Sequence, residues 1–355
     1  MKNPFKFGTI VEGAFFTDRT KELAAIRHTL DSENHLVLIS PRRYGKSSLV
    51  AKAIKESGRP YVSFNFQNVI DVVDLASKIL REVFRLYPFE KVKRQMSHFR
   101  IIPVVSVNPM TNGIDVSFQP TTNESAILED SMELLEKVSR EGKKIIVVFD
   151  EFQEIKSVQK GLDRRMRAIM QEQQKINYIL LGSQESMMTE IFERKKSPFY
   201  HFGQVMYLDR IPYVDFKDYI LERLPLTKEK SEEIADGILS FSNLHPYYTQ
   251  QLASKVWELI TYDGVTDDVV RLAIDQIVDN HDLDYERLWL SRNRTDRLIL
   301  RALSEGNIPV LGNRLPSSTA FSALKRLTDA GFIVRTKNYA IEDPFFERWV
   351  HRNGI

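Results

Sequence analysis

Short apolar runs alternate with helically spaced segments through the first 211 residues of the chain. A mixed run at 61–66 reads as one strand, and four apolar runs, at 36–39, 145–149, 178–181 and 205–208, read as further strands. The run at 36–39 has the composition of a buried strand, and the run at 145–149 has that of a strand buried on both faces. Segments with helical spacing lie between them, at 17–30, 72–86, 124–141 and 161–173. This alternation predicts an α/β fold in which helices cover both faces of a parallel sheet.

The first helical segment carries a start signal of its own. Thr17 or Asp18 can cap its N-terminus, and Leu23, Ile26 and Leu30 form an apolar stripe along it. We therefore expect a capped helix that leads into the strand at 36–39.

Residues 88–122 interrupt the alternation of strands and helices. Two runs, 104–107 and 114–118, flank Asn112-Gly113, and this dipeptide is the strongest short signal for a hairpin. We expect a β-hairpin insertion at about 99–120 that projects from the sheet domain. It is either a structural decoration or a contact surface for a protein partner or DNA.

From about residue 212 the pattern becomes helical. Four helices are expected, at 216–223, 231–241, 246–260 and 267–279. The last part follows the pattern of a winged helix: a helix ended by Gly306, a short segment at 308–314, a helix at 319–330 capped near Ser317, and strands at 332–335 and 339–341. We predict three domains, a core at 1–211, a helical lid at 212–284 and a winged helix at 285–355.

The helix at 319–330 would be the recognition helix of the winged helix. Its polar side carries Ser317, Ser318, Thr319, Ser322, Lys325 and Arg326. Two basic residues make a thin basic face, so contact with double-stranded DNA and a protein-contact or lid role are both open.

Residues 36–50, LVLISPRRYGKSSLV, form the most informative stretch. Strand, loop and helix in this order are the context of a phosphate-binding P-loop, where backbone N–H groups and a helix N-terminus bind anions. Lys46 would reach the outer phosphates, and Ser47 would supply a hydroxyl to magnesium. Ser40 stands where the pattern has glycine, so a strand–turn–helix with a surface lysine is the alternative. The candidate nucleotide-binding residues here are Pro41, Arg42, Arg43, Tyr44, Gly45, Lys46, Ser47 and Ser48.

A second motif, Asp150-Glu151, follows the apolar strand at 145–149. In a P-loop enzyme the first acid holds magnesium and the second polarises the attacking water. A strand followed by an ordinary acidic loop is the alternative. Two such motifs in the right order, each at the end of an apolar strand, indicate a nucleoside triphosphatase.

Two further segments carry candidate residues. Ser183 and Gln184 follow the strand at 178–181, where a polar side chain can lie beside the γ-phosphate; a simple turn is the alternative. Pro246 stands at a predicted helix start after His245 and before two tyrosines, which could pack on an adenine ring or in the core.

Composition limits the remaining possibilities. The chain has 355 residues, 43% of them apolar, no cysteine and seven histidines without zinc-site spacing. It has no signal-peptide pattern and no membrane-length apolar run, so we expect a cytoplasmic protein. Net charge is +2; residues 286–355 carry 12 Lys/Arg and 7 Asp/Glu, a local net charge of +5 that is too small to indicate nucleic-acid binding by itself.

Several motifs together resemble the archaeal-type ATPases related to the AAA+ and STAND classes. They are FTDR with Glu22-Leu23, PRRYGKSS, FDEFQE, GSQESMM followed by SPFY, LHPYY, and the C-terminal DPFFERW. The resemblance implies an ATPase core, a helical lid and a winged helix. It also implies that Lys46 and Ser47 bind phosphate and magnesium, Asp150 holds magnesium, and Glu151 is the catalytic base. Ser183 or Gln184 would sense the γ-phosphate, and His245-Pro246 would approach the adenine base of the nucleotide.

The chain departs from this family at one functional position. Relatives usually carry Gly-Arg shortly after the SP-[FL]-Y stretch, where this chain has His201-Phe202. An arginine finger is worth about 10³–10⁵ in rate, so we expect slow hydrolysis, unless Arg194 or Arg210 substitutes.

We expect an ATP-binding regulatory ATPase that couples its nucleotide state to the winged helix. The choice of ATP over GTP rests on the resemblance, and no guanine-reading NKxD motif is present. The alternatives are a DNA-binding module in which nucleotide is structural, and a scaffold that binds protein partners through the hairpin and the winged helix. An oligomer is compatible with all three.

Overall fold

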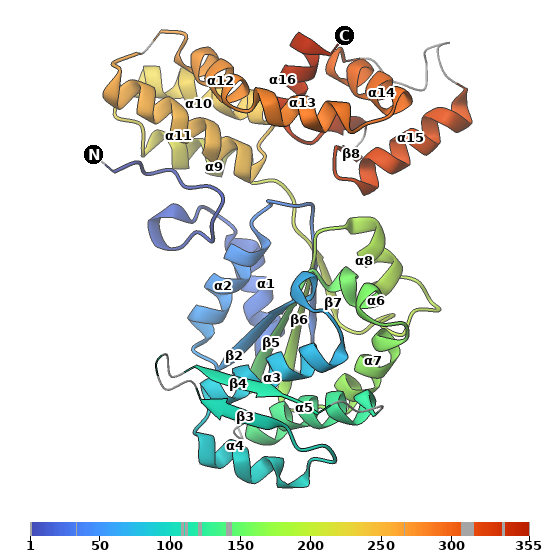
Figure 1. Cartoon of the computed structure of the whole chain (residues 1–355). Helices are drawn as coiled ribbons and strands as arrows, with labels where there is room; N and C mark the ends of the chain where they lie inside the picture. The colour runs from blue at the N-terminus through green and yellow to red at the C-terminus, as the bar shows by residue number, and fades with distance from the viewer. Residues whose placement is uncertain are drawn as a thin grey trace. The chain divides into compact units, whose positions relative to one another are not determined.

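The computed structural model describes residues 2–354 except 33, 108–109, 111–112, 120–122, 140–143, 266, 307–315 and 336–337. The chain forms two compact units (Figure 1). The sheet unit comprises Thr20–Pro41 and Leu49–Leu208, and the helical unit comprises Met1–Arg19, Arg42–Ser48 and Asp209–Ile355. The division into three domains stays a prediction.

The sheet unit is built on a five-stranded sheet with the order β2-β5-β6-β1-β7. Its strands are β1 (Leu36–Ile39), β2 (Tyr61–Asn65), β5 (Ile145–Asp150), β6 (Ile176–Gly182) and β7 (Gln204–Tyr207). Every neighbouring pair is parallel, with Leu38 opposite Leu181 and Val148 opposite Ile179. The predicted parallel sheet is therefore confirmed, and all five carboxyl ends lie at one edge.

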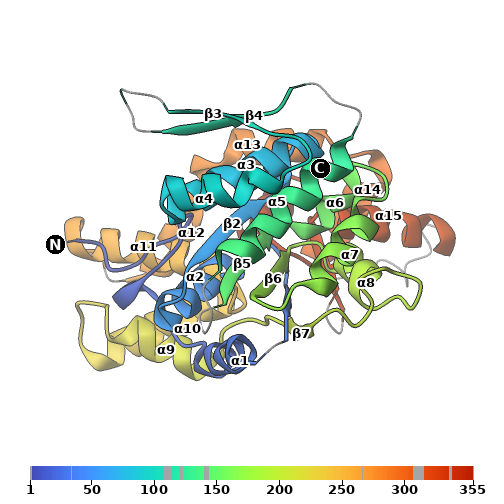
Figure 2. The ribbon, with the colours of Figure 1, turned by 90° about the horizontal axis from the view of Figure 1, so that it is seen from below.

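Helices cover both faces of this sheet (Figure 2). The helices α1 (Thr20–Asp31) and α2 (Lys46–Ser57) lie on one face. The other face carries α3 (Val72–Leu86), α5 (Glu124–Val138) and α7 (Leu162–Glu172). The short helices α4 (Phe89–Gln95), α6 (Ile155–Val158) and α8 (Glu185–Phe192) complete the unit. Strands β1, β5 and β6 are almost wholly buried, as expected for strands covered on both sides.

The start of α1 corrects the sequence analysis. Asp18 and Arg19 have φ angles of 50° and 68°, and the helix begins only at Thr20. The predicted cap at Thr17 or Asp18 is therefore wrong, because a left-handed backbone turns the chain before the helix starts.

Strands β3 (Val104–Val107) and β4 (Ile114–Ser117) form a separate two-stranded antiparallel sheet. Strand β4 contacts α3. Asn112 of the predicted turn lies outside the described residues, and the role of this sheet as a projecting insertion stays a prediction.

The helical unit has one continuous hydrophobic core that includes Phe216, Trp257, Leu300, Leu324 and Phe345. Its first helices are α9 (Tyr213–Leu221), α10 (Lys228–Ser242), α11 (Pro246–Tyr262), α12 (Val269–Asn280) and α13 (Asp282–Leu290). The C-terminal elements are α14 (Arg294–Ser304), α15 (Ser317–Asp329), the antiparallel pair β8 (Ile333–Arg335) and β9 (Tyr339–Ile341), and α16 (Pro344–Asn353).

The C-terminal part differs from the predicted pattern in three places. Ser317 is the first residue of α15 rather than its cap, and Pro316, in the cap position, makes no side-chain cap bond. The predicted segment 308–314 lies outside the described residues. Helix α16 packs against α12, α13 and α14 and was not predicted as a helix. The winged-helix interpretation stays a prediction.

No helix within the described part of the chain is long and apolar enough to cross a bilayer.

Candidate functional site

The carboxyl ends of three neighbouring strands bring several predicted residues together in the sheet unit. Strand β6 lies between β1 and β5. At the end of β1, the backbone N–H of Ser40 donates to the carbonyl of Gly182 at 3.3 Å. At the end of β6, the Ser183 hydroxyl donates to Glu151 Oε2 at 2.6 Å. Polar groups in the crevice outside parallel strands are placed for ligand chemistry.

Glu151 is held in an unusual conformation. Its φ of 50° is left-handed, and its Oε2 accepts hydrogen bonds from both Ser183 and the amide of Gln153. Its neighbour Asp150 accepts a hydrogen bond from the Glu151 backbone N–H at 2.9 Å. A left-handed non-glycine residue at the end of a strand is typical of a functional position.

Sequence reasoning missed Gln153 as part of this group. The residue is fully buried, and its Oε1 has no hydrogen-bond partner among the described residues. No sequence signal marks Gln153, because its burial becomes visible only in the structure. Gln184, the other sensor candidate, is half-buried at the residue before α8 and makes no side-chain cap bond there.

The phosphate loop contains two left-handed residues. Arg43 has a φ of 65° and Gly45 a φ of 89°, and α2 begins at Lys46. Ser40 has no left-handed backbone, so replacing the usual glycine there strains nothing. Tyr44, Lys46 and Ser48 are buried.

The remaining loop residues differ in exposure. Pro41 is half-buried, whereas Arg42, Arg43, Gly45 and Ser47 are exposed. The Ser48 hydroxyl accepts a hydrogen bond from the backbone N–H of Val11 at 3.1 Å, so it is used within the protein.

Within the helical unit, the loop side chains meet the start of α11. The Arg43 guanidinium lies 4.5 Å from the centroid of the Tyr247 ring, and its Nη1 lies 3.5 Å from the Tyr248 hydroxyl. The Tyr44 ring packs edge-on against His245 at 4.8 Å between centroids. Arg43 and Tyr44 therefore join the phosphate loop to the segment that the sequence singled out at 245–248.

His245 is almost fully buried, and both of its ring nitrogens are occupied. Nδ1 caps α11 by accepting hydrogen bonds from the backbone N–H groups of Tyr247 and Tyr248, and Pro246 takes the first helical turn as expected. Because Nδ1 accepts, the proton of the neutral ring lies on Nε2, which donates to Glu342 Oε1 at 3.1 Å. Contact of His245 and Pro246 with the adenine base of a nucleotide stays a prediction.

Burial shifts the pKa values of two tyrosines in this region. It raises the pKa of the Tyr248 hydroxyl, and the charge of Asp343 adds to that shift. Burial also raises the pKa of Tyr44, with a further contribution from Glu342 that Arg210 partly offsets.

The candidate substitutes for an arginine finger are engaged elsewhere. Arg210 donates from Nε to the Tyr44 hydroxyl at 3.3 Å and from Nη1 to the carbonyl of Asn243. Arg194 is an exposed side chain 3.5 Å from Glu190. Phe202, at the place where the resemblance implies an arginine, is buried, stacks on His35 at 4.5 Å and packs edge-on against Phe199.

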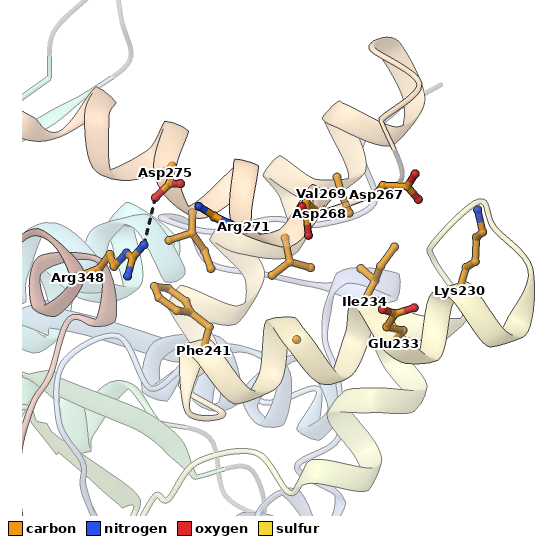
Figure 3. A pocket seen from close by; sticks show the side chains of 13 residues that line it. Lys230, Glu233, Ile234, Phe241, Asp267, Asp268, Val269, Arg271, Asp275 and Arg348 are labelled. Carbon is orange, nitrogen blue, oxygen red and sulfur yellow. Dashed lines mark ion pairs between the residues drawn. The ribbon is translucent and has the colours of Figure 1, made fainter. Parts of the chain in front are cut away.

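A groove of about 720 Å³ lies between α10 and α12, far along the chain from the phosphate loop (Figure 3). Its floor is apolar, with Ile234, Phe241 and Val269, and its rim is charged and includes the Arg348–Asp275 pair at 3.8 Å. No residue of the phosphate loop lines it, so it is not the candidate nucleotide site.

Comparison with known proteins identifies the fold and the family. A family model described as an ATPase domain predominantly from Archaea matches residues 16–248. A Walker-type ATPase of Pyrococcus abyssi is 18% identical, with 95% of this chain and 96% of that chain covered and a TM-score of 0.64. The ORC2 protein of Aeropyrum pernix, as ADPNP–ADP complexes, is 15% identical over 98% and 96% of the two chains, with a TM-score of 0.58.

A RuvB variant of Thermotoga maritima is 14% identical over 94% and 95% of the two chains, with a TM-score of 0.51. A comparison with curated proteins finds no match. The structural similarities, all below 25% identity, show a shared fold. Because the family model covers more than half of the sequence, this chain belongs to the family of ATPase domains found predominantly in Archaea.

Proposed function

We propose that the protein binds ATP, hydrolyses it slowly, and uses its nucleotide state to control its C-terminal region. The observation that carries this proposal is the phosphate loop itself. Lys46 begins a helix directly after a strand and a left-handed glycine turn, in a chain of an ATPase family. The similar ORC2 structure of Aeropyrum pernix is described as ADPNP–ADP complexes, which supports ATP as the ligand.

The roles of the individual residues follow from their chemistry. The backbone of 41–48 and the N-terminus of α2 would bind the phosphates, with Lys46 as the counter-charge. Ser47 and Asp150 would hold magnesium, because a hydroxyl and a carboxylate are the hard oxygen ligands that this ion prefers. When bound, magnesium neutralises charge on the phosphate oxygens.

Glu151 is proposed as the general base. Its Oε2 already accepts the Ser183 hydroxyl at 2.6 Å, so a change in that contact would alter its readiness to accept a proton from water. Ser183 and Gln184 are proposed to lie near the γ-phosphate. Slow turnover is expected because Phe202 replaces the usual arginine, and Arg210 already donates to Tyr44 and to the Asn243 carbonyl.

The link to the C-terminal region rests on contacts within the helical unit. Tyr44 packs on His245, and His245 in turn donates to Glu342, which precedes α16. A movement of Tyr44 on nucleotide binding would therefore be transmitted to the segment between β9 and α16 through these two contacts.

The test of nucleotide binding is calorimetric titration of Mg-ATP into the wild type and Lys46→Ala. Loss of a charged hydrogen bond of this kind is expected to weaken binding roughly 10- to 100-fold. Lys52→Ala is the matched control, since it removes the same charge from the same helix, where Lys52 pairs with Glu56. Equal affinity of wild type and Lys46→Ala would reject the phosphate-loop assignment.

A protein-binding role for residues 99–120 is the second candidate. Ile102, Val104 and Val107 expose 73%, 53% and 52% of their surface, which is unusual for apolar side chains around a two-stranded sheet. A pull-down whose partner is lost with Val104→Lys and Val107→Lys, while ATP affinity is unchanged, would support it. Retention of every partner by this variant would reject it.

A further inference from the structure

Arg43 occupies a backbone conformation that disfavours it. Its φ of 65° lies in the left-handed region, where a side chain other than glycine costs free energy. Gly45, two residues on, has the residue type that such a turn prefers. An arginine at this position indicates that its side chain makes a contribution that glycine could not.

The Arg43 side chain is engaged by tyrosines at the start of α11 and by an acid beyond them. It lies over Tyr247, approaches the Tyr248 hydroxyl, and interacts electrostatically with Asp343. Burial raises the pKa of the neighbouring Tyr44, and the charge of Glu342 is the next largest cause of that increase. The consecutive acids Glu342 and Asp343 therefore interact electrostatically with the consecutive loop residues Tyr44 and Arg43, respectively.

The negative charge of this acidic pair is compensated mainly by hydrogen bonds from neutral groups. Asp343 Oδ1 accepts from the backbone N–H groups of Phe345 at 2.9 Å and Phe346 at 3.2 Å, and its Oδ2 accepts from the Tyr285 hydroxyl at 3.4 Å. Burial still raises the pKa of Asp343, and these backbone bonds and the charges of Arg43 and His245 offset part of that effect. Glu342 accepts from His245 through Oε1, but its buried Oε2 has no hydrogen-bond partner among the residues that the structure describes. Such charge beside a loop opposes the binding of an anion to that loop.

We propose that Glu342 and Asp343 form an inhibitory latch that lowers the affinity of the phosphate loop for nucleotides. They add negative charge beside the loop, and Asp343 and Tyr248 draw the Arg43 guanidinium away from a phosphate ligand. Nucleotide binding and the latch contacts then compete, so a bound phosphate chain favours release of the segment before α16. This inference rests on the proposed nucleotide binding by the loop.

Two substitutions remove the charges and keep the hydrogen bonds. In Glu342→Gln the amide oxygen can still accept from His245 Nε2. In Asp343→Asn the side-chain oxygen can still cap α16, since asparagine is as good a cap as aspartate. Glu347→Gln is the matched control, because Glu347 lies on α16 and burial is the only cause of its raised pKa.

The experiment is calorimetric titration of Mg-ADP, Mg-ATP and adenosine into the full chain. The double variant is expected to bind both nucleotides roughly 10-fold more tightly than the wild type, a typical coupling between sites, with a smaller gain at high salt. Adenosine, which has no phosphate, should bind all variants equally, and Glu347→Gln should match the wild type. Tyr248→Phe, which removes only a hydroxyl, should shift nucleotide affinity in the same direction as the double variant.

Unchanged or weaker nucleotide binding by the folded double variant would overturn the latch, as would an equal gain for adenosine. If the double variant does not fold, the same outcomes for Tyr248→Phe decide the question. The nucleotide site is judged separately by Lys46→Ala. Nucleotide binding that depends on Lys46 but not on Glu342, Asp343 or Tyr248 would leave the proposed function standing and reject the latch. Absence of nucleotide binding by the wild type would reject both.

Discussion

Phe202 is the residue on which the proposal of slow hydrolysis depends. The resemblance to the archaeal-type ATPases implies an arginine at this place, whereas here the ring packs among His35, Tyr178 and Phe199. The ring is 8% exposed, so the position belongs to the core and not to a catalytic surface. The resemblance at SPFY predicted where the arginine should be, and the structure shows that the side chain in its place is part of the hydrophobic core.

Restoring the arginine should therefore damage the protein. Phe202→Arg is expected to lower the free energy of unfolding by at least about 3 kcal/mol, because it removes a buried ring and buries a charge. His201→Arg, at an exposed neighbouring position where both side chains carry the cost of a left-handed φ of 55°, should change it by no more than about 1 kcal/mol. Urea unfolding measures both values. A stable Phe202→Arg with faster ATP turnover would contradict this account.

His35 should make the sheet unit sensitive to mild acid. Burial, and then the charges of Arg167 and Lys144, lower its pKa from 6.5 to about 4. The folded protein therefore binds fewer protons than the unfolded chain between these values, and stability present above pH 6.5 is lost as the pH falls toward 4. From pH 7 to pH 5 the wild type should lose about 2 kcal/mol more than His35→Asn does.

This comparison uses urea unfolding of both proteins at the two pH values. Asparagine is chosen because its side-chain oxygen can replace Nδ1 as acceptor for the backbone N–H of Tyr178, a contact of 3.2 Å in the wild type. Equal losses in the two proteins would show that His35 is not the cause.

At the scale of elements, the sequence predicted best the strands whose residues must be apolar because they are buried. Runs such as 145–149 became β5 because a strand covered on both faces must be apolar throughout. The start of α1 was mistaken because the left-handed turn at Asp18 and Arg19 has no local signal. Helix α16 was missed although its start is readable, with Asp343 as cap and Pro344 in the first turn.

The cap of α16 carries a stability prediction of its own. Because burial raises the pKa of Asp343, the folded protein holds its proton more tightly than the unfolded chain, and stability falls as the pH rises through the shifted value. Asp343→Asn keeps the cap and removes this cost. It should unfold at a higher temperature than the wild type at pH 7, and the difference should shrink as the pH falls below Asp343's raised pKa.

Asp71→Asn is the matched control, since Asp71 caps α3 at an exposed site through a bond to the Asp74 backbone N–H at 2.7 Å. It should leave the melting temperature nearly unchanged. A wild type that is more stable than Asp343→Asn at pH 7 would show that the buried charge is fully compensated.

The face of α15 bears on the DNA hypothesis. Arg326, one of the two basic residues expected on the recognition helix, pairs with the buried Asp296 through two hydrogen bonds. This ion pair partly neutralises the Arg326 guanidinium, and Lys325 is the other basic residue of this face. The face of α15 is therefore less suited to bind the phosphates of DNA than the sequence alone suggested.

At the scale of the whole molecule, long-range contacts account for what sequence reasoning could not reach. The strand order β2-β5-β6-β1-β7 places β6 between the two strands that carry the main motifs, and no periodicity reveals such an order. The contacts of Tyr44 with His245 and of His245 with Glu342 join segments about 200 and 100 residues apart, respectively. Single residues such as Lys46 and Glu151 were identifiable because their motifs are local.

The central claim is that this chain hydrolyses ATP slowly with Glu151 as base. The most direct test is steady-state release of phosphate from Mg-ATP by the wild type and Glu151→Gln, with Glu154→Gln as a neighbouring control. We expect wild-type turnover below the typical enzyme value of about 10 s⁻¹. It should fall by roughly 100-fold or more in Glu151→Gln while ATP is still bound, and stay unchanged in Glu154→Gln. Equal turnover by wild type and Glu151→Gln would contradict the account.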